Sequence, residues 1–406
     1  MTGAPDIVLA VIDSGVDIDH EDLAANIWTN PGEIPGDGID NDNNGFIDDV
    51  NGWDFIDGDN DPRDPDVNSH GTHVSGIAGA VGNNGIGVSG VAQQIQIMPI
   101  RAIGGPTAGV VEAINYAVAN GAPISNNSWG ATGVFIQSIF DAIEAAQAED
   151  HLFVSSAGND ALDTDITDHT PSSFDLTNII AVAASNDDDV FDTSYSNWGP
   201  TSVDLFAPGT NVFSTFENNR YGTNTGTSMA SPVVAGAAAI LRSLSPTSSA
   251  EQIKDILLSS VDVQPSMIGQ VVSDGRLNLD RAIAQVSGIQ LGVFPESIRE
   301  DAGANAATGV VRRFGDLSNA LSVTVVSSDT TEATVPSIVT IPAGSSRAFF
   351  AINAVDDTIL DGTQTVGITA STGFGSPETT QFIDVTDVES LTLTIDRAEI
   401  LSLIHI

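Results

Sequence analysis

Three side chains that lie far apart in the sequence form a set able to transfer an acyl group. Ser228 lies in GTSMASP at 226–232, His70 opens HGTHVSGIAG at 70–79, and Asp13 follows the apolar run IVLAVI. A serine hydroxyl becomes a nucleophile when a base takes its proton, and histidine has a pKa suited to that task. An aspartate behind the histidine fixes its tautomer and stabilises the imidazolium. The sequence therefore predicts nucleophilic catalysis by these three residues.

The loop SSAGND at 155–160 supplies a candidate hydrogen-bond donor for the same chemistry. Acyl transfer needs donors aimed at the developing oxyanion, and losing one costs about 3–4 kcal/mol of transition-state stabilisation. The side-chain amide of Asn159 is the first candidate, and the backbone N–H of Ser228 is the second. Taken singly, such motifs also occur as helix caps, packed histidines and turns. Their conjunction in one chain favours a shared site.

Apolar runs and helical patterns alternate between residues 7 and 285. The runs are 7–12, 95–100, 151–155 and 179–184, and the helical patterns include 109–119 and 136–148. Short continuous apolar runs are typical of strands buried on both faces. The alternation predicts an α/β fold, with a parallel sheet flanked by helices. In such folds the site lies at the carboxyl ends of the strands, which is where the candidate residues fall.

The character of the sequence changes after residue 288. Runs rich in Val, Ile, Thr and Phe at 321–326, 335–341 and 348–355 are separated by turn residues, which predicts a small all-β sandwich. We expect a domain at 1–287, a linker at 285–293 and a sandwich at 288–389. Residues 390–406 are interpreted as the start of a further truncated module or as an uninformative tail.

The acidic loop DGIDNDNNGFIDD at 37–49 has the alternating oxygen ligands that calcium prefers. The predicted ligands are Asp40, Asp42, Asn44, the carbonyl of Phe46 and Asp49, with Asp48 as an alternative closing group. Gly45 permits the sharp turn, and no flanking helices are expected, so this is not an EF-hand. A solvated acidic turn is the alternative interpretation.

The four motifs, in this order, resemble the subtilisin-like serine proteases, or subtilases, over roughly residues 6–285. The resemblance implies that Asp13 is the orienting acid, His70 the general base, Ser228 the nucleophile and Asn159 the oxyanion donor. It also implies that a substrate strand pairs with Asn127, Ser128, Trp129 and Gly130. The specificity pocket would be walled in part by Ala157 and Gly158.

The same resemblance implies a second calcium site, formed by Asp22, Asn84 and the carbonyls of Val81, Ile86 and Val88. The segment from 288 resembles Calx-beta-type sandwiches, some of which bind calcium at acidic turns. Here Asp356, Asp357 and Asp361 match that turn best, and a spacer without calcium is the alternative. The implied cofactor is therefore Ca²⁺, and the implied first domain is a peptidase domain with a truncated N-terminus.

Composition limits the partners. Asp and Glu number 54 against 12 Lys and Arg, for a formal net charge of −42, so nothing would neutralise the phosphates of a nucleic acid. There is no cysteine, which rules out thiol catalysis, and no apolar run reaches the ~18 residues of a membrane span. No signal peptide or inhibitory pro-segment is visible, so we expect the chain to begin inside a longer precursor.

The leading hypothesis is a monomeric, secreted or cell-surface serine endopeptidase that acts on proteins or peptides. The main alternative is a catalytically inactive, calcium-dependent adhesion or matrix-binding protein. An intracellular hydrolase is disfavoured by the calcium loops.

Overall fold

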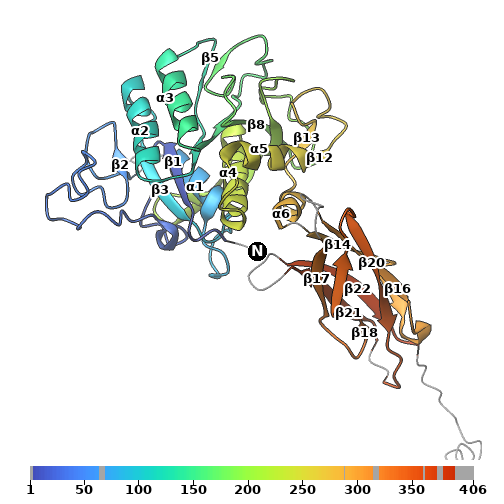
Figure 1. The fold of residues 1–406 in the computed structure, drawn as a ribbon. Coiled ribbons are helices and arrows are strands. Elements are labelled where there is room, and N and C mark those ends of the chain that lie inside the picture. The colour runs from blue at the N-terminus through green and yellow to red at the C-terminus, as the bar shows by residue number, and fades with distance from the viewer. Residues whose placement is uncertain are drawn as a thin grey trace, which may run out of the picture. The chain divides into compact units, whose positions relative to one another are not determined.

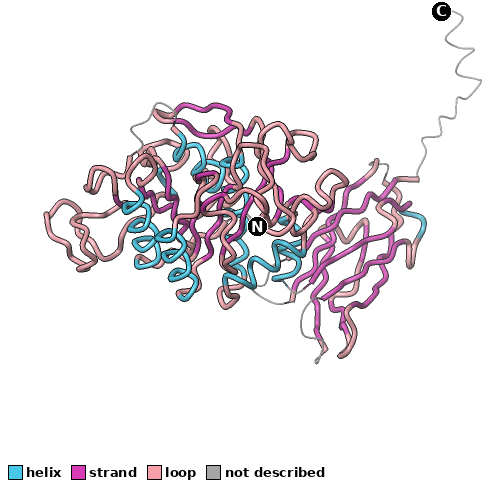
Figure 2. The backbone as a smooth tube through the Cα atoms, turned by 90° about the horizontal axis from the view of Figure 1, so that it is seen from above, coloured by secondary structure: helices cyan, strands magenta, loops and turns pink. Residues whose placement is uncertain are grey.

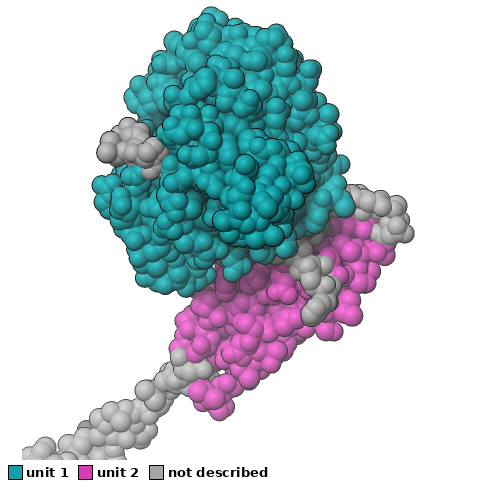
Figure 3. Space-filling model, turned by 90° about the vertical axis from the view of Figure 1, so that its left-hand side faces the viewer, with its two compact units in different colours: residues 1–286 teal, residues 287–406 magenta. Residues whose placement is uncertain are grey.

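The computed structural model describes residues 3–63, 69–287, 289–313, 320–359, 362–372 and 378–388. The chain forms two compact units, residues 1–286 and 287–406 (Figure 3). Each unit has its own core and is described by itself.

A nine-stranded sheet forms the centre of the first unit (Figure 1). Its strands, in spatial order, are β12 (Asp262–Val263), β13 (Gly275–Arg276), β9 (Leu205–Pro208), β8 (Ile179–Ser185), β6 (Leu152–Ser156), β4 (Ile124–Asn127), β1 (Val8–Asp13), β3 (Gln96–Arg101) and β2 (Trp53–Asp54). Every neighbouring pair is parallel except β12 and β13. The predicted α/β fold class, followed by β-sheets in the second unit, is confirmed.

Alternation along the strands builds a core on each face of the sheet. Leu9 and Val11 of β1 pack into one core, whereas Ala10 and Ile12 pack into the other, because successive side chains of a strand point to opposite faces. Helices cover both faces (Figure 2). The first core is covered by α1 (His70–Gly79), α4 (Thr227–Leu244), α5 (Ala250–Ser259) and α6 (Leu279–Ser287), and the second by α2 (Thr107–Ala119) and α3 (Gln137–Ala148).

Short elements complete the first unit. They are a 3₁₀ turn, η1 (Ala24–Asn26), and two small antiparallel pairs, β5 (Ala131–Thr132) with β7 (His169–Thr170) and β10 (Val212–Phe216) with β11 (Arg220–Asn224). Helix α4 is the one helix, among the described residues, that is long and apolar enough to cross a membrane. Since 78% of it is buried inside the fold, it serves as the central core helix.

A glycine lets helix α1 begin directly against the end of β1. A Cβ atom at Gly71 would lie 2.0 Å from the carbonyl oxygen of Gly15, so no other residue fits there. The backbone N–H of Gly71 donates to Ser14 Oγ at 3.0 Å. This close approach brings His70, the first residue of α1, next to the last residue of β1.

The second unit is a sandwich of two sheets around one core. One sheet has the order β14 (Ile289–Phe294), β16 (Ala307–Arg313), β20 (Arg347–Ala354) and β18 (Ala333–Thr334). The other has the order β15 (Ser297–Arg299), β22 (Thr379–Thr386), β21 (Gln364–Ser371), β17 (Leu321–Ser327) and β19 (Ile338–Ile341), and a 3₁₀ turn, η2 (Glu300–Ala302), follows β15.

The predicted linker at 285–293 is wrong. Helix α6 continues to Ser287 and strand β14 begins at Ile289, because Ile289, Leu291 and Val293 alternate into the sandwich core. The tail predicted at 390–406 and the predicted calcium residue Asp361 lie outside the described residues.

The buried imidazole of His151 generates a prediction about acid stability. Its Nδ1 lies 2.7 Å from the Ala122 carbonyl oxygen and its Nε2 lies 2.8 Å from Ser125 Oγ. Burial, together with the charge of nearby Arg242, lowers the pKa of His151 to about 4. The unfolded chain therefore binds a proton that the native chain excludes, so the stabilisation is complete above pH 6.5 and is lost between pH 6.5 and 4.

We expect His151→Gln to flatten the dependence of the unfolding free energy on pH in this window, by up to about 1.4 kcal/mol per pH unit. Urea unfolding of both proteins at pH 7, 6 and 5 measures the slope. Equal slopes for the native chain and the variant would contradict the assignment.

Candidate active site

The four predicted catalytic residues share one open cleft of about 770 Å³. It is lined by Asp13, Ser14, His70, Ile103, Gly104, Ser128, Trp129, Gly130, Asn159, Phe216, Asn224, Thr225, Ser228 and Met229. Asp13 ends β1, Ser128 follows β4, which pairs with β1, and Asn159 follows β6, which pairs with β4. The cleft therefore lies at the carboxyl ends of parallel strands, as expected for this class of fold.

A short bond joins Asp13 to His70. The imidazole Nδ1 donates to Asp13 Oδ1 at 2.6 Å, and the same oxygen accepts the backbone N–H of Ser14 at 2.7 Å. The Asp13 side chain is 1% exposed, whereas the His70 ring is 33% exposed. The short bond from Nδ1 to the Asp13 carboxylate holds the ring in one tautomer. Because Nδ1 donates to Asp13, Nε2 is the ring nitrogen that can exchange a proton with groups in the cleft.

Reciprocal hydrogen bonds fix Ser228 against Ser128. Ser228 Oγ donates to the Ser128 carbonyl at 3.2 Å, and Ser128 Oγ donates to the Ser228 carbonyl at 2.8 Å. The second bond has a cause in the sequence. Pro232 is the sixth residue of α4, and it has no N–H to give to the carbonyl four residues earlier. Ser128 supplies the missing donor.

The Asn159 amide is oriented by the start of α4. Its Oδ1 accepts the backbone N–H of Thr227 at 2.8 Å and Thr227 Oγ1 at 3.0 Å. Because the amide oxygen is occupied, the Nδ2 group is the donor that Asn159 offers to the cleft. Gly158, with a φ of +100°, allows the turn that directs the amide there.

Asn197 supports this loop and was not found from the sequence. Its side chain is completely buried. It donates to the Ala157 carbonyl at 2.9 Å and accepts the backbone N–H groups of Asp160 and Leu162, each at 3.0 Å. Asn197 lies in a Ser-Asn-Trp-Gly segment at 196–199, and nothing local to that segment tells which loop it contacts. Only the fold brings it beside the loop after β6.

The predicted substrate-binding residues divide into two groups. Ser128, Trp129 and Gly130 line the cleft. Asn127, Ala157 and Gly158 are buried instead, and Asn127 Nδ2 donates to Ser125 Oγ at 2.8 Å. A smaller recess of about 240 Å³ adjoins the cleft at Trp129 and Gly130, and its lining includes Val110, Ile136 and Ile139.

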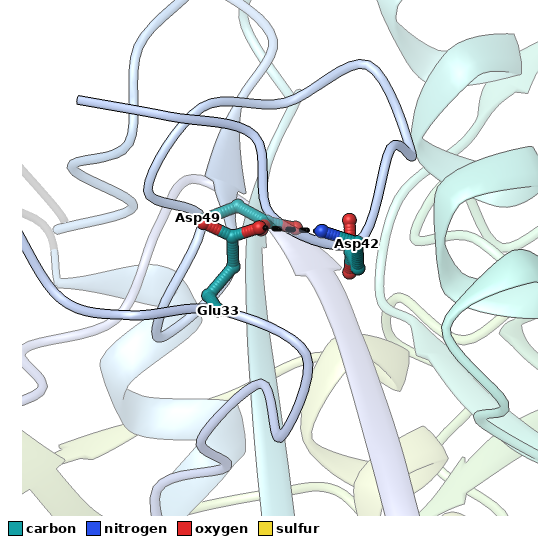
Figure 4. A group of neighbouring side chains, drawn as sticks. All are labelled: Glu33, Asp42 and Asp49. Atoms are coloured by element: carbon teal, nitrogen blue, oxygen red, sulfur yellow. Dashed lines mark hydrogen bonds between the residues drawn. The ribbon is translucent and has the colours of Figure 1, made fainter. Parts of the chain in front are cut away.

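Three carboxylates lie close together at the acidic loop. Two of them, Asp42 and Asp49, belong to the loop at 37–49, and the third, Glu33, precedes it. Oxygens of Glu33, Asp42 and Asp49 lie within 4.8 Å of one another, and the Asp42 backbone N–H donates to Glu33 Oε1 at 3.3 Å (Figure 4). Glu33 was not predicted, because it precedes the alternating pattern. Asp40 is not a member of the group: its oxygens accept the N–H groups of Asn44 and Gly45 at 3.1 and 2.9 Å and so cap the turn.

The remaining predicted ligands of this loop lie close to the carboxylates. Asn44 Nδ2 contacts Asp42 Oδ2 at 3.1 Å and Asp49 Oδ2 at 3.0 Å, and the Phe46 ring packs against Tyr116. Tyr116 donates its hydroxyl to Asp49 at 2.5 Å. Burial, together with the charge of Asp42, raises the pKa of Asp49.

Asp22 and Asn84 of the second predicted calcium site are in contact beside the loop after α1, whereas Val81, Ile86 and Val88 bond to them through their N–H groups and not through the predicted carbonyls. The buried carboxylate of Asp22 accepts Asn84 Nδ2 at 2.6 Å and the Val88 N–H at 2.8 Å. The Val81 N–H donates to the Asp22 carbonyl at 2.9 Å, and the Ile86 N–H donates to Asn84 Oδ1 at 3.1 Å.

Comparisons with known proteins identify the family. A family model described as the Subtilase family matches residues 4–315. Subtilisin-like protease 1 of Plasmodium vivax is 37% identical over 299 residues, which cover 68% of this chain and 46% of that protein. A thermophilic serine proteinase of Bacillus sp. (strain AK1) is 38% identical over 239 residues, which cover 58% of this chain and 52% of that protein.

Two solved structures extend the similarity. A protease from Pseudoalteromonas arctica PAMC 21717 superposes with a TM-score of 0.59 at 28% identity, covering 70% of this chain and 91% of that one. A cold-adapted subtilisin-like serine proteinase gives 0.53 at 28% identity, covering 68% and 88%. The fold and the cleft define an α/β protein with a site at the carboxyl edge of its sheet. The chain belongs to the subtilase family. It spans about half the length of the curated relatives named above.

The bonds of Asn197 generate a prediction. We expect Asn197→Ala to lower the unfolding free energy by about 1–3 kcal/mol, because buried backbone groups of the loop lose their partner. Thermal unfolding measures the loss. Asn197→Asp keeps the acceptor for Asp160 and Leu162 but loses the donor to Ala157, so it should differ from Asn197→Ala. A Tm of Asn197→Ala equal to the native value would contradict this role.

Proposed function

We propose that the chain is a serine endopeptidase that hydrolyses proteins or peptides through an acyl-enzyme. The observation that carries the proposal is the 2.6 Å bond between Asp13 and His70 in the cleft that Ser228 also lines. Ser228 Oγ attacks the scissile carbonyl while His70 Nε2 takes its proton, which then passes to the leaving amine. Water, activated by the same imidazole, adds to the acyl ester and releases Ser228.

The oxyanion would be held by two donors at the start of α4. These are the Asn159 amide, whose oxygen is already engaged with Thr227, and the backbone N–H of Ser228. Both are fixed before substrate binds, so their orientation costs nothing during the reaction. The backbone of Ser128, Trp129 and Gly130, residues that line the cleft, would pair with an extended substrate.

Calcium is the proposed cofactor, and the residues at the acidic loop fit it. Glu33 Oε2 is buried and has no hydrogen-bond partner among the described residues, and Glu33 as a whole is only 8% exposed. Asp49, fully buried, and Asp42 complete a group of hard oxygen ligands of the kind calcium prefers. An ion there would neutralise carboxylates that otherwise repel one another. We assign the same role to the Asp22 and Asn84 group.

We further propose that residues 1–287 form the peptidase domain and 288–389 a Calx-beta-like sandwich. Export to the cell surface or medium is consistent with calcium ligation, and the acidic composition argues against nucleic acid as a partner. The inactive adhesion protein is not favoured, because a chain without catalytic function has no need to keep four reactive side chains in one cleft.

Covalent labelling tests the activity directly. A fluorophosphonate probe should label the native protein at Ser228, and Ser228→Ala should abolish labelling and lower kcat by about 10⁶-fold, the effect of removing the serine in subtilisin. Ser75→Ala is a matched control, because the Ser75 hydroxyl is buried in α1 without a partner among the described residues. Labelling that persists in Ser228→Ala would disprove the assignment.

Calcium titration tests the cofactor. We expect added calcium to raise the Tm of the native chain, since an ion at 100 times its Kd stabilises by about 2.7 kcal/mol. Glu33→Gln should weaken this stabilisation because it removes one charged ligand, whereas exposed Glu112→Gln should leave it unchanged. Differential scanning calorimetry with calcium and with chelator measures both. If Glu33→Gln and Glu112→Gln respond to calcium alike, Glu33 is not a ligand.

A further inference from the structure

The gap between two strand extensions decides which side chain can lie beside Ser228. Strands β4 and β6 are parallel neighbours, with Asn127 opposite Ser155. Their continuations, 128–130 and 157–159, therefore run side by side next to the Ser228 hydroxyl, which donates to the Ser128 carbonyl at 3.2 Å. With a substrate strand paired to 128–130, as proposed above, the side chain of the residue whose carbonyl reaches Ser228 would be directed toward this gap.

The gap is filled by the ring of His169. A Cβ atom placed on Gly130 would lie 2.2 Å from His169 Cε1 and 2.6 Å from Nε2. A Cβ atom placed on Gly158 would lie 2.3 Å from Asn197 Nδ2, 2.7 Å from the same His169 Nε2 and 2.8 Å from Cδ2. One edge of the imidazole thus lies against both glycines, and neither glycine has room for a methyl group. The His169 ring and the Asn197 amide together account for the burial of Gly158, which does not line the cleft.

Hydrogen bonds hold the ring in this position. His169 belongs to β7, which pairs with β5 so that His169 lies opposite Thr132. Its Nδ1 lies 2.8 Å from Ser172 Oγ, and its backbone N–H donates to Ser173 Oγ at 2.9 Å. The side chain is 4% exposed. Burial lowers the pKa of His169, although Asp160 opposes the shift, so the ring is neutral near pH 7.

We propose that His169 is a specificity-determining residue, which limits the substrate residue at the attacked carbonyl to a small side chain such as Gly, Ala or Ser. The inference rests on the proposed peptidase function and names its substrate class. Its cause is steric: an aromatic or branched side chain cannot enter a gap that the imidazole occupies. Removing the ring would free space between the two glycines for a larger substrate side chain.

Peptides that differ only at this position test the proposal on the full chain in calcium buffer. We expect native kcat/KM for Ala to exceed that for Leu and Phe by about 10–200-fold, the discrimination that small steric differences achieve. His169→Gly should raise kcat/KM for Phe at least tenfold relative to Ala. His169→Phe is the matched control: it keeps a ring in the gap, so the preference for small residues should persist.

A native enzyme that cleaves the Phe peptide as well as the Ala peptide would overturn the proposal, as would a His169→Gly variant with an unchanged Phe-to-Ala ratio. Should His169→Gly fail to fold, labelling of the native chain by peptidyl phosphonates carrying Ala or Phe decides, with faster labelling by Ala expected. A native chain that cleaves no peptide and takes no fluorophosphonate refutes the peptidase function itself. A labelled chain that accepts Phe refutes only the role of His169.

Discussion

Parallel pairing between β1, β4 and β6 is the constraint on which the site depends. These strands are neighbours in the sheet, so Asp13, Ser128 and Asn159, which end or follow them, meet at one edge although more than a hundred residues separate the first from the second. Helices α1 and α4 then begin at that edge, with His70 and Ser228 in their first turns. A slip of one residue in β1 would turn Asp13 to the opposite face of the sheet and away from His70.

The buried Asp13 carboxylate is stabilised at this edge through one of its two oxygens. An imidazole and a backbone amide donate to Oδ1, whereas Oδ2 is buried without a hydrogen-bond partner among the described residues. Loss of hydration is costly for a carboxylate without such partners. The same reasoning applies at the acidic loop, where Glu33 keeps one buried oxygen without a donor among the described residues. Unlike Asp13, Glu33 has two further carboxylates, Asp42 and Asp49, with oxygens within 4.8 Å, and this concentration of negative charge is the physical basis for proposing a cation there.

Much of this arrangement could be predicted from the sequence, because strand burial and motif order are local properties. The run at 7–12 marks β1, and the glycines around His70 and Ser228 mark the close approaches. What could not be predicted is contact between segments distant in sequence. Asn197 and His169 act through loops that the fold brings beside Gly158, and Glu33 precedes the acidic pattern by several residues. The strand at 289–294 was interpreted as a linker because six alternating residues give a weak periodic signal.

The positions missed from the sequence share a physical character. His169 packs between motif glycines, Asn197 forms hydrogen bonds to a motif loop, and Glu33 adds a carboxylate to the acidic loop. None of the three takes part directly in the proposed reaction. Motif residues are constrained by chemistry, so their types and spacing can be read directly. Residues that shape the space around them need only the right volume and one or two hydrogen bonds, which many sequences can supply. Gly130 and Gly158 illustrate the difference: the sequence indicates two backbones that come close to a ligand, whereas the structure places the ring of His169 between them. Relatives with the same reactive side chains can therefore differ in substrate through such positions.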